Sequence, residues 1–307
     1  MEKLDKRKLF LLAISALAAL IVVIAAVLVI RGEAGSREGP QDQGPLVPEG
    51  QRLVEDLYEG RRLIPDFDIP ANTYDTAKFV EEDGLIRYQD GAAVWGVDVS
   101  EFQGAIDWKQ VKDAGAGFAI LRLGWRGSTE GGLNLDTTFQ QNYEGAAAAG
   151  LPVGVYFFSQ AVTEEEAREE AAFVLDALEG KTIAYPVVFD WEPPIPSESL
   201  PAQDLRAYGM DGDQVSRFAL AFCEKVAGAG YTPCVYTNKT MAYGFFDLEL
   251  LGDYPLWYAE YQPAPSLYYH FDLWQYTDSA AVPGIPGEAD VNICFVPYGY
   301  TKKVRGF

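Results

Sequence analysis

From Val94 onwards, short apolar runs typical of β-strands alternate with segments whose pattern is typical of helices. No other feature constrains the fold as strongly, because strands that are joined through helices form a parallel sheet. The chain has 307 residues, which is long enough to bury one large core. The predicted strands cover 94–100, 118–123, 152–159, 185–192 and 233–238, and the predicted helices cover 107–115, 136–149, 163–178 and 211–227.

The alternation of strands and helices ends after the fifth predicted strand. Three further strand-like runs, at 256–261, 272–276 and 291–296, follow with hardly any helical pattern between them. The length of the whole series suits a sheet that closes into a barrel. We therefore expect an α/β barrel whose last part consists of strands alone.

The fourth predicted strand ends in two acids, Asp190 and Glu192, which are followed by Pro193-Pro194. Proline cannot donate to a ladder, so the strand stops there and its acidic end reaches solvent. Side chains alternate along a strand, which places both carboxylates on one face. Like charges at this spacing do not both ionise freely, so we expect one acid to keep its proton while the other stays charged. Glycoside hydrolysis uses such a pair, although a solvated acidic strand end has the same pattern.

Further acids and aromatic residues fall at or near predicted strand ends. In parallel barrels, the carboxyl ends of the strands form the working face. Acids and rings at one mouth suit a carbohydrate, whose C–H faces stack on rings while its hydroxyls take hydrogen bonds. Structural alternatives exist, since tyrosines also serve as core aromatics and an aspartate can cap a turn. The residues are Asp98, Asp290, Tyr156, Tyr236 and Trp274.

Residues 9–30 carry no charge, and a helix of that length crosses a hydrocarbon layer about 30 Å thick. Residues 1–8 are basic, so the positive-inside rule predicts a cytoplasmic tail and an extracellular remainder. The alternative is a cleaved signal peptide, whose apolar region normally runs for only ~7–15 residues. We therefore expect an uncleaved transmembrane helix.

The membrane span is followed by a stretch without a core pattern. Residues 31–50 are rich in Gly, Pro, Gln and charged residues, which predicts a flexible linker. Residues 51–93 consist of short amphipathic pieces, and Asp83-Gly84 between two alternating runs is a hairpin signal. We expect a small extension with a β-hairpin, followed by the barrel over 94–307.

Charge and cysteine content exclude several classes of function. The formal net charge is -21 at pH 7, which argues against nucleic acid or anionic lipid as a ligand. Three scattered cysteines are too few for a disulfide framework, so we expect buried thiols, with a Cys223–Cys234 bridge as the alternative. One histidine, His270, makes a catalytic zinc or a Ser-His-Asp triad hard to build. We expect neither a metal nor a cofactor.

A series of short motifs follows the predicted strands in order. They are Gly96-Val-Asp-Val-Ser-Glu-Phe-Gln-Gly-Ala-Ile-Asp-Trp108, Gly154-Val-Tyr-Phe-Phe-Ser159, Pro186-Val-Val-Phe-Asp-Trp-Glu192, Tyr236-Thr-Asn238, Leu256-Trp-Tyr-Ala259, Leu273-Trp-Gln-Tyr276, Gly284-Ile and Asp290-Val-Asn292. In these motifs the chain resembles glycoside hydrolase family 25, the Chalaropsis-type lysozymes. The resemblance implies an irregular TIM-like (β/α)5β3 barrel and N-acetylmuramidase activity.

The resemblance also implies a role for each site residue. Glu192 resembles the general acid that protonates the leaving glycosidic oxygen. Asp190 resembles the charge that orients or stabilises the 2-acetamido group of the substrate, or a water molecule. Asp98 and Asp290 resemble two further acids that position the substrate and tune this pair. The residues that resemble aromatic side chains of the substrate groove are Tyr156, Tyr236 and Trp274.

Together these features predict a membrane-anchored peptidoglycan hydrolase that cleaves the β-1,4 bond between N-acetylmuramic acid and N-acetylglucosamine in cell-wall remodelling. The expected partners are peptidoglycan glycan strands and, through a single N-terminal helix, the cell membrane, with the catalytic domain outside. Two alternatives stay open. One is a catalytically inactive glycan-binding or scaffold protein on the same barrel, and the other is an enzyme of the same fold that acts on another amino-sugar polymer.

Overall fold

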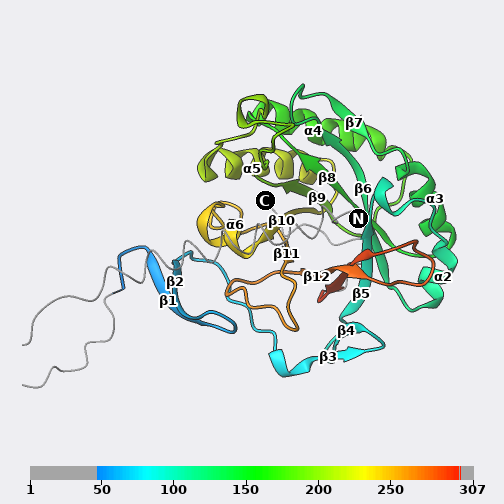
Figure 1. Cartoon of the computed structure of the whole chain (residues 1–307), viewed down its shortest axis with the longest axis horizontal. Coiled ribbons are helices and arrows are strands. Elements are labelled where there is room, and N and C mark those ends of the chain that lie inside the picture. Colours follow the sequence, from blue (N-terminus) through cyan, green and yellow to red (C-terminus); the bar gives the residue numbers. More distant parts are fainter. Residues whose placement is uncertain (1–46, 297, 299–307) are drawn as a thin grey trace, which may run out of the picture. The chain divides into compact units, whose positions relative to one another are not determined.

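The structure is a computed structural model that describes residues 47–296 and residue 298, and within this part eight strands close a barrel (Figure 1). The sheet closes because β5 pairs with both β6 and β13. The barrel strands are β5 (Val94–Val99), β6 (Phe118–Arg126), β8 (Val153–Ser159), β9 (Val187–Trp191), β10 (Pro233–Asn238), β11 (Leu256–Ala259), β12 (Leu273–Ala280) and β13 (Ala289–Cys294).

Each of the first five barrel strands is followed by a helix, and the last three are followed by none in the described residues. This is the five-plus-three arrangement that the resemblance implies. The helices are α2 (Trp108–Asp113), α3 (Phe139–Ala148), α4 (Glu164–Ala177), α5 (Gly212–Gly228) and α6 (Lys239–Gly244), and they lie outside the sheet (Figure 1). The short helix α6 and the strand β7 (Leu133–Leu135), which pairs with the end of β6, were not predicted.

Local signals explain most helix starts. The side chain of Asp211 accepts from the backbone of Gln214, and Gln214 reaches back to form a capping box at the start of α5. Thr163 caps α4 by accepting from the amide of Glu166, and the side chain of Glu166 accepts from the amide of Val162, one residue before the cap. Both arrangements satisfy amides that have no partner in the first turn of a helix.

Strand direction departs from a fully parallel sheet at one place. Strands β5 to β12 of the barrel pair in parallel, whereas β13 is antiparallel to both β12 and β5. The start of β13 therefore lies at the rim where the other strands end. This direction brings Asp290 to that rim from the first half of its strand, not from a carboxyl end.

The barrel interior is filled by side chains of one strand face. An interior cluster includes Phe118 and Ile120 of β6 and Trp257 of β11, while Ala119 and Leu121 belong to the larger cluster that includes residues of the helices. This alternation is the two-residue period of a strand. All three cysteines are buried free thiols, as the first of the two interpretations predicted.

The residues ahead of the barrel form two antiparallel hairpins, one predicted and one not. The predicted turn lies at Asp83 and Gly84, both with positive φ, between β3 (Phe79–Glu82) and β4 (Leu85–Tyr88). The other hairpin joins β1 (Gln51–Asp56) to β2 (Gly60–Pro65). Three 3-10 turns complete the described elements: η1 (Thr76–Lys78), η2 (Glu101–Gln103) and η3 (Ala202–Asp204).

The extension packs directly on the barrel. The ring of Tyr74 stacks on Phe295 with 3.9 Å between centroids, and Phe79 meets Trp274 edge-on at 5.1 Å. Tyr74 also donates a hydrogen bond to the carbonyl of Phe271. These contacts bury apolar surface from both parts, so the extension and the barrel stabilise each other.

The predicted tail at 1–8, the span at 9–30 and most of the linker at 31–50 lie outside the described residues. Within residues 47–296 and at residue 298, no helix has both the length and the apolar character to cross a membrane.

Candidate active site

The four predicted acids gather at one rim of the barrel. Asp98 is the fifth residue of β5, Asp190 the fourth of β9, and Glu192 follows β9 directly. Asp290 stands opposite Asp98 in the register of β13 and β5. Strand ends thus bring together carboxyl groups from three separate parts of the chain.

Asp98 is held by two amide side chains. Its Oδ2 accepts from Nε2 of Gln275 at 2.9 Å and from Nδ2 of Asn292 at 2.7 Å. The carboxyl group is buried, and burial raises its pKa to about 6 even though both hydrogen bonds favour the charged form. Asp98 therefore titrates near neutral pH in a fixed orientation.

Asp190 and Glu192 influence each other's protonation. Burial raises the pKa of Asp190 well above its ordinary value, and the nearby charges of Glu192 and Asp98 raise it further. Burial also raises the pKa of Glu192, which is only partly exposed. The pair therefore binds protons more tightly than free carboxyl groups do. Asp190 lies deeper than Glu192, and the assignment of the charge to Asp190 stays a prediction.

One oxygen of Asp190 has no hydrogen-bond partner within the described residues. This oxygen, Oδ1, is buried. An unpaired carboxylate oxygen is costly, whereas the protonated acid or a bound donor removes the cost. The guanidinium of Arg122 lowers the pKa of Asp190, but it is itself paired with Asp136 at 2.8 Å and Glu101 at 3.0 Å.

Asp290 completes the acidic group. Burial raises its pKa to about 8, with further contributions from the charges of Asp98 and Asp278. The raised pKa values of these acids arise from their shared burial at one rim. Acids perturbed by desolvation and by each other are typical of catalytic sites.

Aromatic residues surround the acids. The hydroxyl groups of Tyr236 and Tyr261 both donate to Oε1 of Gln275, at 3.1 and 3.0 Å. Trp257 lies edge-on to Tyr156 and Tyr236, with ring centroids 5.9 and 5.0 Å away. The predicted residues Tyr156 and Tyr236 therefore lie within this group, and both side chains are partly exposed.

The structure does not place Trp274 on the exposed surface of the candidate site. Its side chain is fully buried, and its indole nitrogen donates to the carbonyl of Glu260 at 2.9 Å. The neighbouring Gln275 points to Asp98, so Trp274 faces the opposite side of β12 and packs against Phe79 of the extension. These contacts join β12 to the extension and to Glu260.

Several residues of the site were not singled out from the sequence. Alternation along strands offered a signal for one of them, since Asn292 stands two positions after Asp290 on the same face. Gln160 is a further case: its Nε2 donates to the backbone carbonyl of Glu192 at 3.0 Å, and its side chain is buried. The residues that sequence reasoning missed are Arg122, Gln160, Trp257, Tyr261, Gln275 and Asn292.

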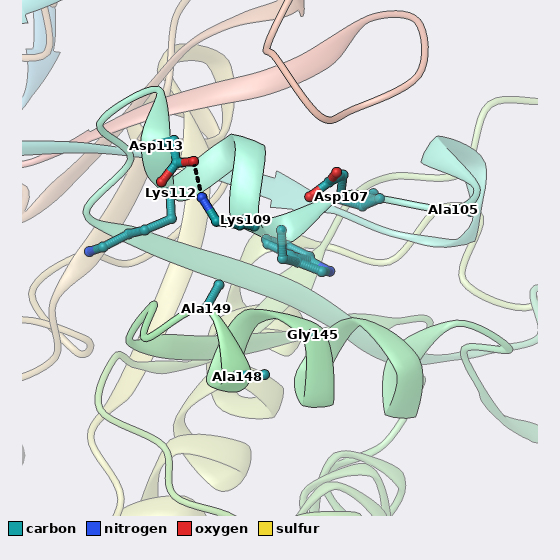
Figure 2. A pocket seen from close by; sticks show the side chains of 10 residues that line it. Ala105, Asp107, Lys109, Lys112, Asp113, Gly145, Ala148 and Ala149 are labelled. Atoms are coloured by element: carbon teal, nitrogen blue, oxygen red, sulfur yellow. Dashed lines mark hydrogen bonds and ion pairs between the residues drawn. The ribbon is translucent and has the colours of Figure 1, made fainter.

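A separate hollow lies away from these acids. Figure 2 shows it between α2 and α3, with an ion pair between Lys109 and Asp113 at its edge. Its volume is about 870 Å³, but its lining includes none of the four acids. Because these side chains belong to the helices outside the sheet, we assign the chemistry to the barrel rim instead.

Comparisons with known proteins agree with this geometry. The model of the family described as glycosyl hydrolases family 25 matches residues 97–285. The autolytic lysozyme of Clostridium acetobutylicum is 29% identical over 201 residues, which are 64% of this chain and 54% of that protein. Lysozyme M1 of Streptomyces globisporus is 27% identical over 215 residues, which are 66% of this chain and 68% of that protein. This chain thus spans about half the length of the first relative.

Solved structures share the fold. The modular autolysin LytC of Streptococcus pneumoniae gives a TM-score of 0.58 at 23% identity and covers 81% of this chain and 57% of its own. A family 25 glycosyl hydrolase of Bacillus anthracis gives 0.55 at 21% identity, over 66% of this chain and 89% of its own. The family match includes Asp98, Asp190 and Glu192 and extends over more than half of the chain. By this match, the chain belongs to glycosyl hydrolases family 25.

Proposed function

We propose that this protein is a peptidoglycan hydrolase, an N-acetylmuramidase that cleaves the β-1,4 bond between N-acetylmuramic acid and N-acetylglucosamine. The observation that carries the proposal is the pairing of Asp190 and Glu192, whose pKa values are raised by burial at one end of β9. Family membership and two relatives named as lysozymes support the same reaction class.

Glu192 is the general acid in this proposal. Its raised pKa keeps a proton on the carboxyl group, and its partial exposure lets that proton reach a bound glycan. The proton passes to the glycosidic oxygen as the bond from that oxygen to C1 of N-acetylmuramic acid breaks. Water then adds to C1 and releases a proton, which restores the acid.

The other three acids stabilise positive charge and orient the sugar. Asp190 lies on the same strand face as Glu192 and has an oxygen free to meet the 2-acetamido group or a water molecule. Once Asp190 ionises, its negative charge favours the oxocarbenium-like transition state. Asp98 and Asp290 face each other across β5 and β13, and the charge of Asp98 helps to raise the pKa of Asp190 after burial and the charge of Glu192.

We further propose that residues 9–30 anchor the enzyme in the cell membrane as a single-pass helix, with the N-terminus in the cytoplasm and the barrel outside. The uncharged run and the basic residues before it support this orientation. An anchor raises the local concentration of enzyme near the wall, as any tether does. Such tethering suits remodelling of the cell's own wall.

The test is release of reducing ends from purified peptidoglycan by the full-length protein, with mass spectrometry of the products. We expect products that carry N-acetylmuramic acid at the reducing end, and we expect Glu192→Gln to abolish them. Glu179→Gln serves as the matched control, because Glu179 is an exposed glutamate just after α4. Binding without release by a folded wild-type protein would favour the inactive glycan-binding protein, and cleavage of chitin oligomers in preference would favour another amino-sugar polymer.

A further inference from the structure

The turn between β1 and β2 is fixed against the barrel by charged groups. Lys239, the first residue of α6, contacts Asp56 at 2.9 Å and Glu59 at 3.1 Å, both of which belong to the hairpin. The same ammonium group contacts Glu260 at 3.0 Å, just after β11. The hairpin and α6 lie side by side (Figure 1). One half-buried cation thus joins the extension to the segment that follows β11.

Tyr58 at this turn is fixed by its hydroxyl group. The hydroxyl donates to the carbonyl of Ala264 at 2.8 Å and accepts from the amide of Ala264 at 3.0 Å. At the other end of the residue, the amide of Tyr58 donates to Oδ1 of Asp56 at 2.9 Å. The ring is therefore held in place, yet 41% of the residue stays exposed. An exposed ring whose orientation is already fixed loses little entropy when a ligand stacks on it.

The loop that contains Ala264, the hydrogen-bond partner of Tyr58, also carries a residue of the candidate active site. Tyr261 stands three positions before Ala264, is 49% exposed, and donates to Gln275, which in turn holds Asp98. Tyr58 and the neighbouring exposed Leu57 therefore lie beside the loop that carries Tyr261. A concave seam, lined in part by Leu57 and Ser266, lies between the turn and this loop.

Exposed apolar side chains of the barrel also gather on the side where the parallel strands end. Among the large exposed ones within residues 94–296, most belong to segments that leave the carboxyl ends of strands, where a polymer would cross the mouth. These are Phe102, Leu135, Ile195, Tyr208 and Tyr261. Scattered apolar residues on a surface are ordinary, but their concentration on one side marks a binding surface.

We propose that the β1–β2 turn forms a glycan-binding subsite, in which Tyr58 stacks against a sugar of the strand beyond the one that is cleaved. The proposal rests on the proposed function. The occupant is a neutral N-acetylated sugar and not a cationic group of a stem peptide, because the two acids closest to Tyr58 are already paired: Asp56 with Lys239, and Glu59 with Lys239 and Arg62. The hydroxyl of Tyr58 is occupied, so the contact is made by the ring face.

Binding is measured with the full-length protein in the inactive Glu192→Gln background, by co-sedimentation with peptidoglycan. We expect Tyr58→Ala to weaken binding about tenfold, as loss of one well-placed aromatic anchor does. Tyr58→Phe keeps the ring and stays within about twofold of the parent. Leu63→Ala is the matched control, because Leu63 is equally exposed on the same hairpin but stands on the strand β2, away from the turn. Equal losses in Tyr58→Ala and Tyr58→Phe would assign Tyr58 a purely structural role and overturn the proposal.

Turnover separates this subsite from the catalytic groups. With Glu192 intact, Tyr58→Ala should raise KM for long glycan strands while leaving kcat, and the turnover of a tetrasaccharide, unchanged. The same KM change is expected on strands stripped of stem peptides, and its absence there would assign the turn to peptide and overturn the proposal. A wild-type protein that cleaves normally while Tyr58→Ala has no effect refutes the subsite alone, whereas a wild-type protein that neither binds nor cleaves refutes the proposed function.

Discussion

Asp98 and Asp290 stand directly opposite each other on the antiparallel strands β5 and β13. Cross-strand neighbours on one face lie about 4.5–5.5 Å apart at Cβ, and like charges in such a pair destabilise a sheet. The pKa of Asp98 is about 6 and that of Asp290 about 8, and burial is the largest cause of both increases. The protein therefore holds an unfavourable pair of acids where a merely structural site would have removed one.

Asp290→Asn should stabilise the protein, and more so at high pH. The pKa of Asp290 in the folded state is about 8, above the value of roughly 3.9 expected for an unfolded chain. Its protonation thus favours folding below pH 4, and that contribution is lost as pH rises towards 8. Since one pKa unit corresponds to about 1.4 kcal/mol, we expect a gain of up to roughly 5 kcal/mol at pH 8 and little at pH 4. Thermal melts at both pH values measure it, and a gain independent of pH would contradict the explanation.

Asn292→Ala should raise the pKa of Asp98 above about 6. Asn292 donates to the Asp98 carboxylate and also accepts from the indole of Trp257 at 2.7 Å. A hydrogen bond to a charged group is worth roughly 1.5–3 kcal/mol, so the expected rise is about one to two units. Titration of the carboxyl carbons by NMR measures it. Asn134→Ala is the control, because Asn134 is exposed and its side chain bonds only to the backbone of Gly132.

Much of the acid arrangement was predictable because it depends on local patterns. Prolines after Glu192 end the strand, and the period of two places Asp190 and Glu192 on one side. Helices between strands imply parallel pairing, which collects strand ends at one rim. These arguments do not require knowledge of which strands are neighbours. They predicted the barrel and the three acids that lie at carboxyl ends of strands, Asp98, Asp190 and Glu192.

Other features depend on contacts between distant segments. The direction of β13 follows from its pairing with β5 and β12, and no short pattern near Asp290 encodes it. Neighbouring residues of a strand face opposite sides of the sheet. The sequence of β12 alone therefore does not show whether Trp274 or Gln275 faces the interior. The β1–β2 hairpin lacks the Asp-Gly pair that revealed the β3–β4 turn, so its charged link through Lys239 was not foreseen.

Tyr236 and Tyr261 should act as alternative supports for Gln275. Both hydroxyls donate to the same Oε1, so either one alone still satisfies this oxygen. We expect Tyr236→Phe and Tyr261→Phe each to reduce kcat/KM less than about fivefold, and the double variant to reduce it by more than the product of the two. A double-mutant cycle measures this coupling. Simple multiplication of the two effects would show that the tyrosines act independently, for example through separate contacts with the glycan.

Trp274→Phe tests whether Trp274 stabilises the fold or binds substrate. The indole is fully buried against the extension and donates to the carbonyl of Glu260, so its replacement leaves a cavity and removes one of the two hydrogen bonds that this carbonyl accepts. We expect a loss of roughly 2–4 kcal/mol in unfolding free energy, with KM for peptidoglycan unchanged below the new melting temperature. Denaturant unfolding and turnover on the same preparation measure both quantities.

Phe173→Leu is the control, because Phe173 packs on the barrel from α4, far along the chain from the extension. A raised KM with unchanged stability would mean that Trp274 contacts substrate, and such a result would restore the role that the sequence suggested.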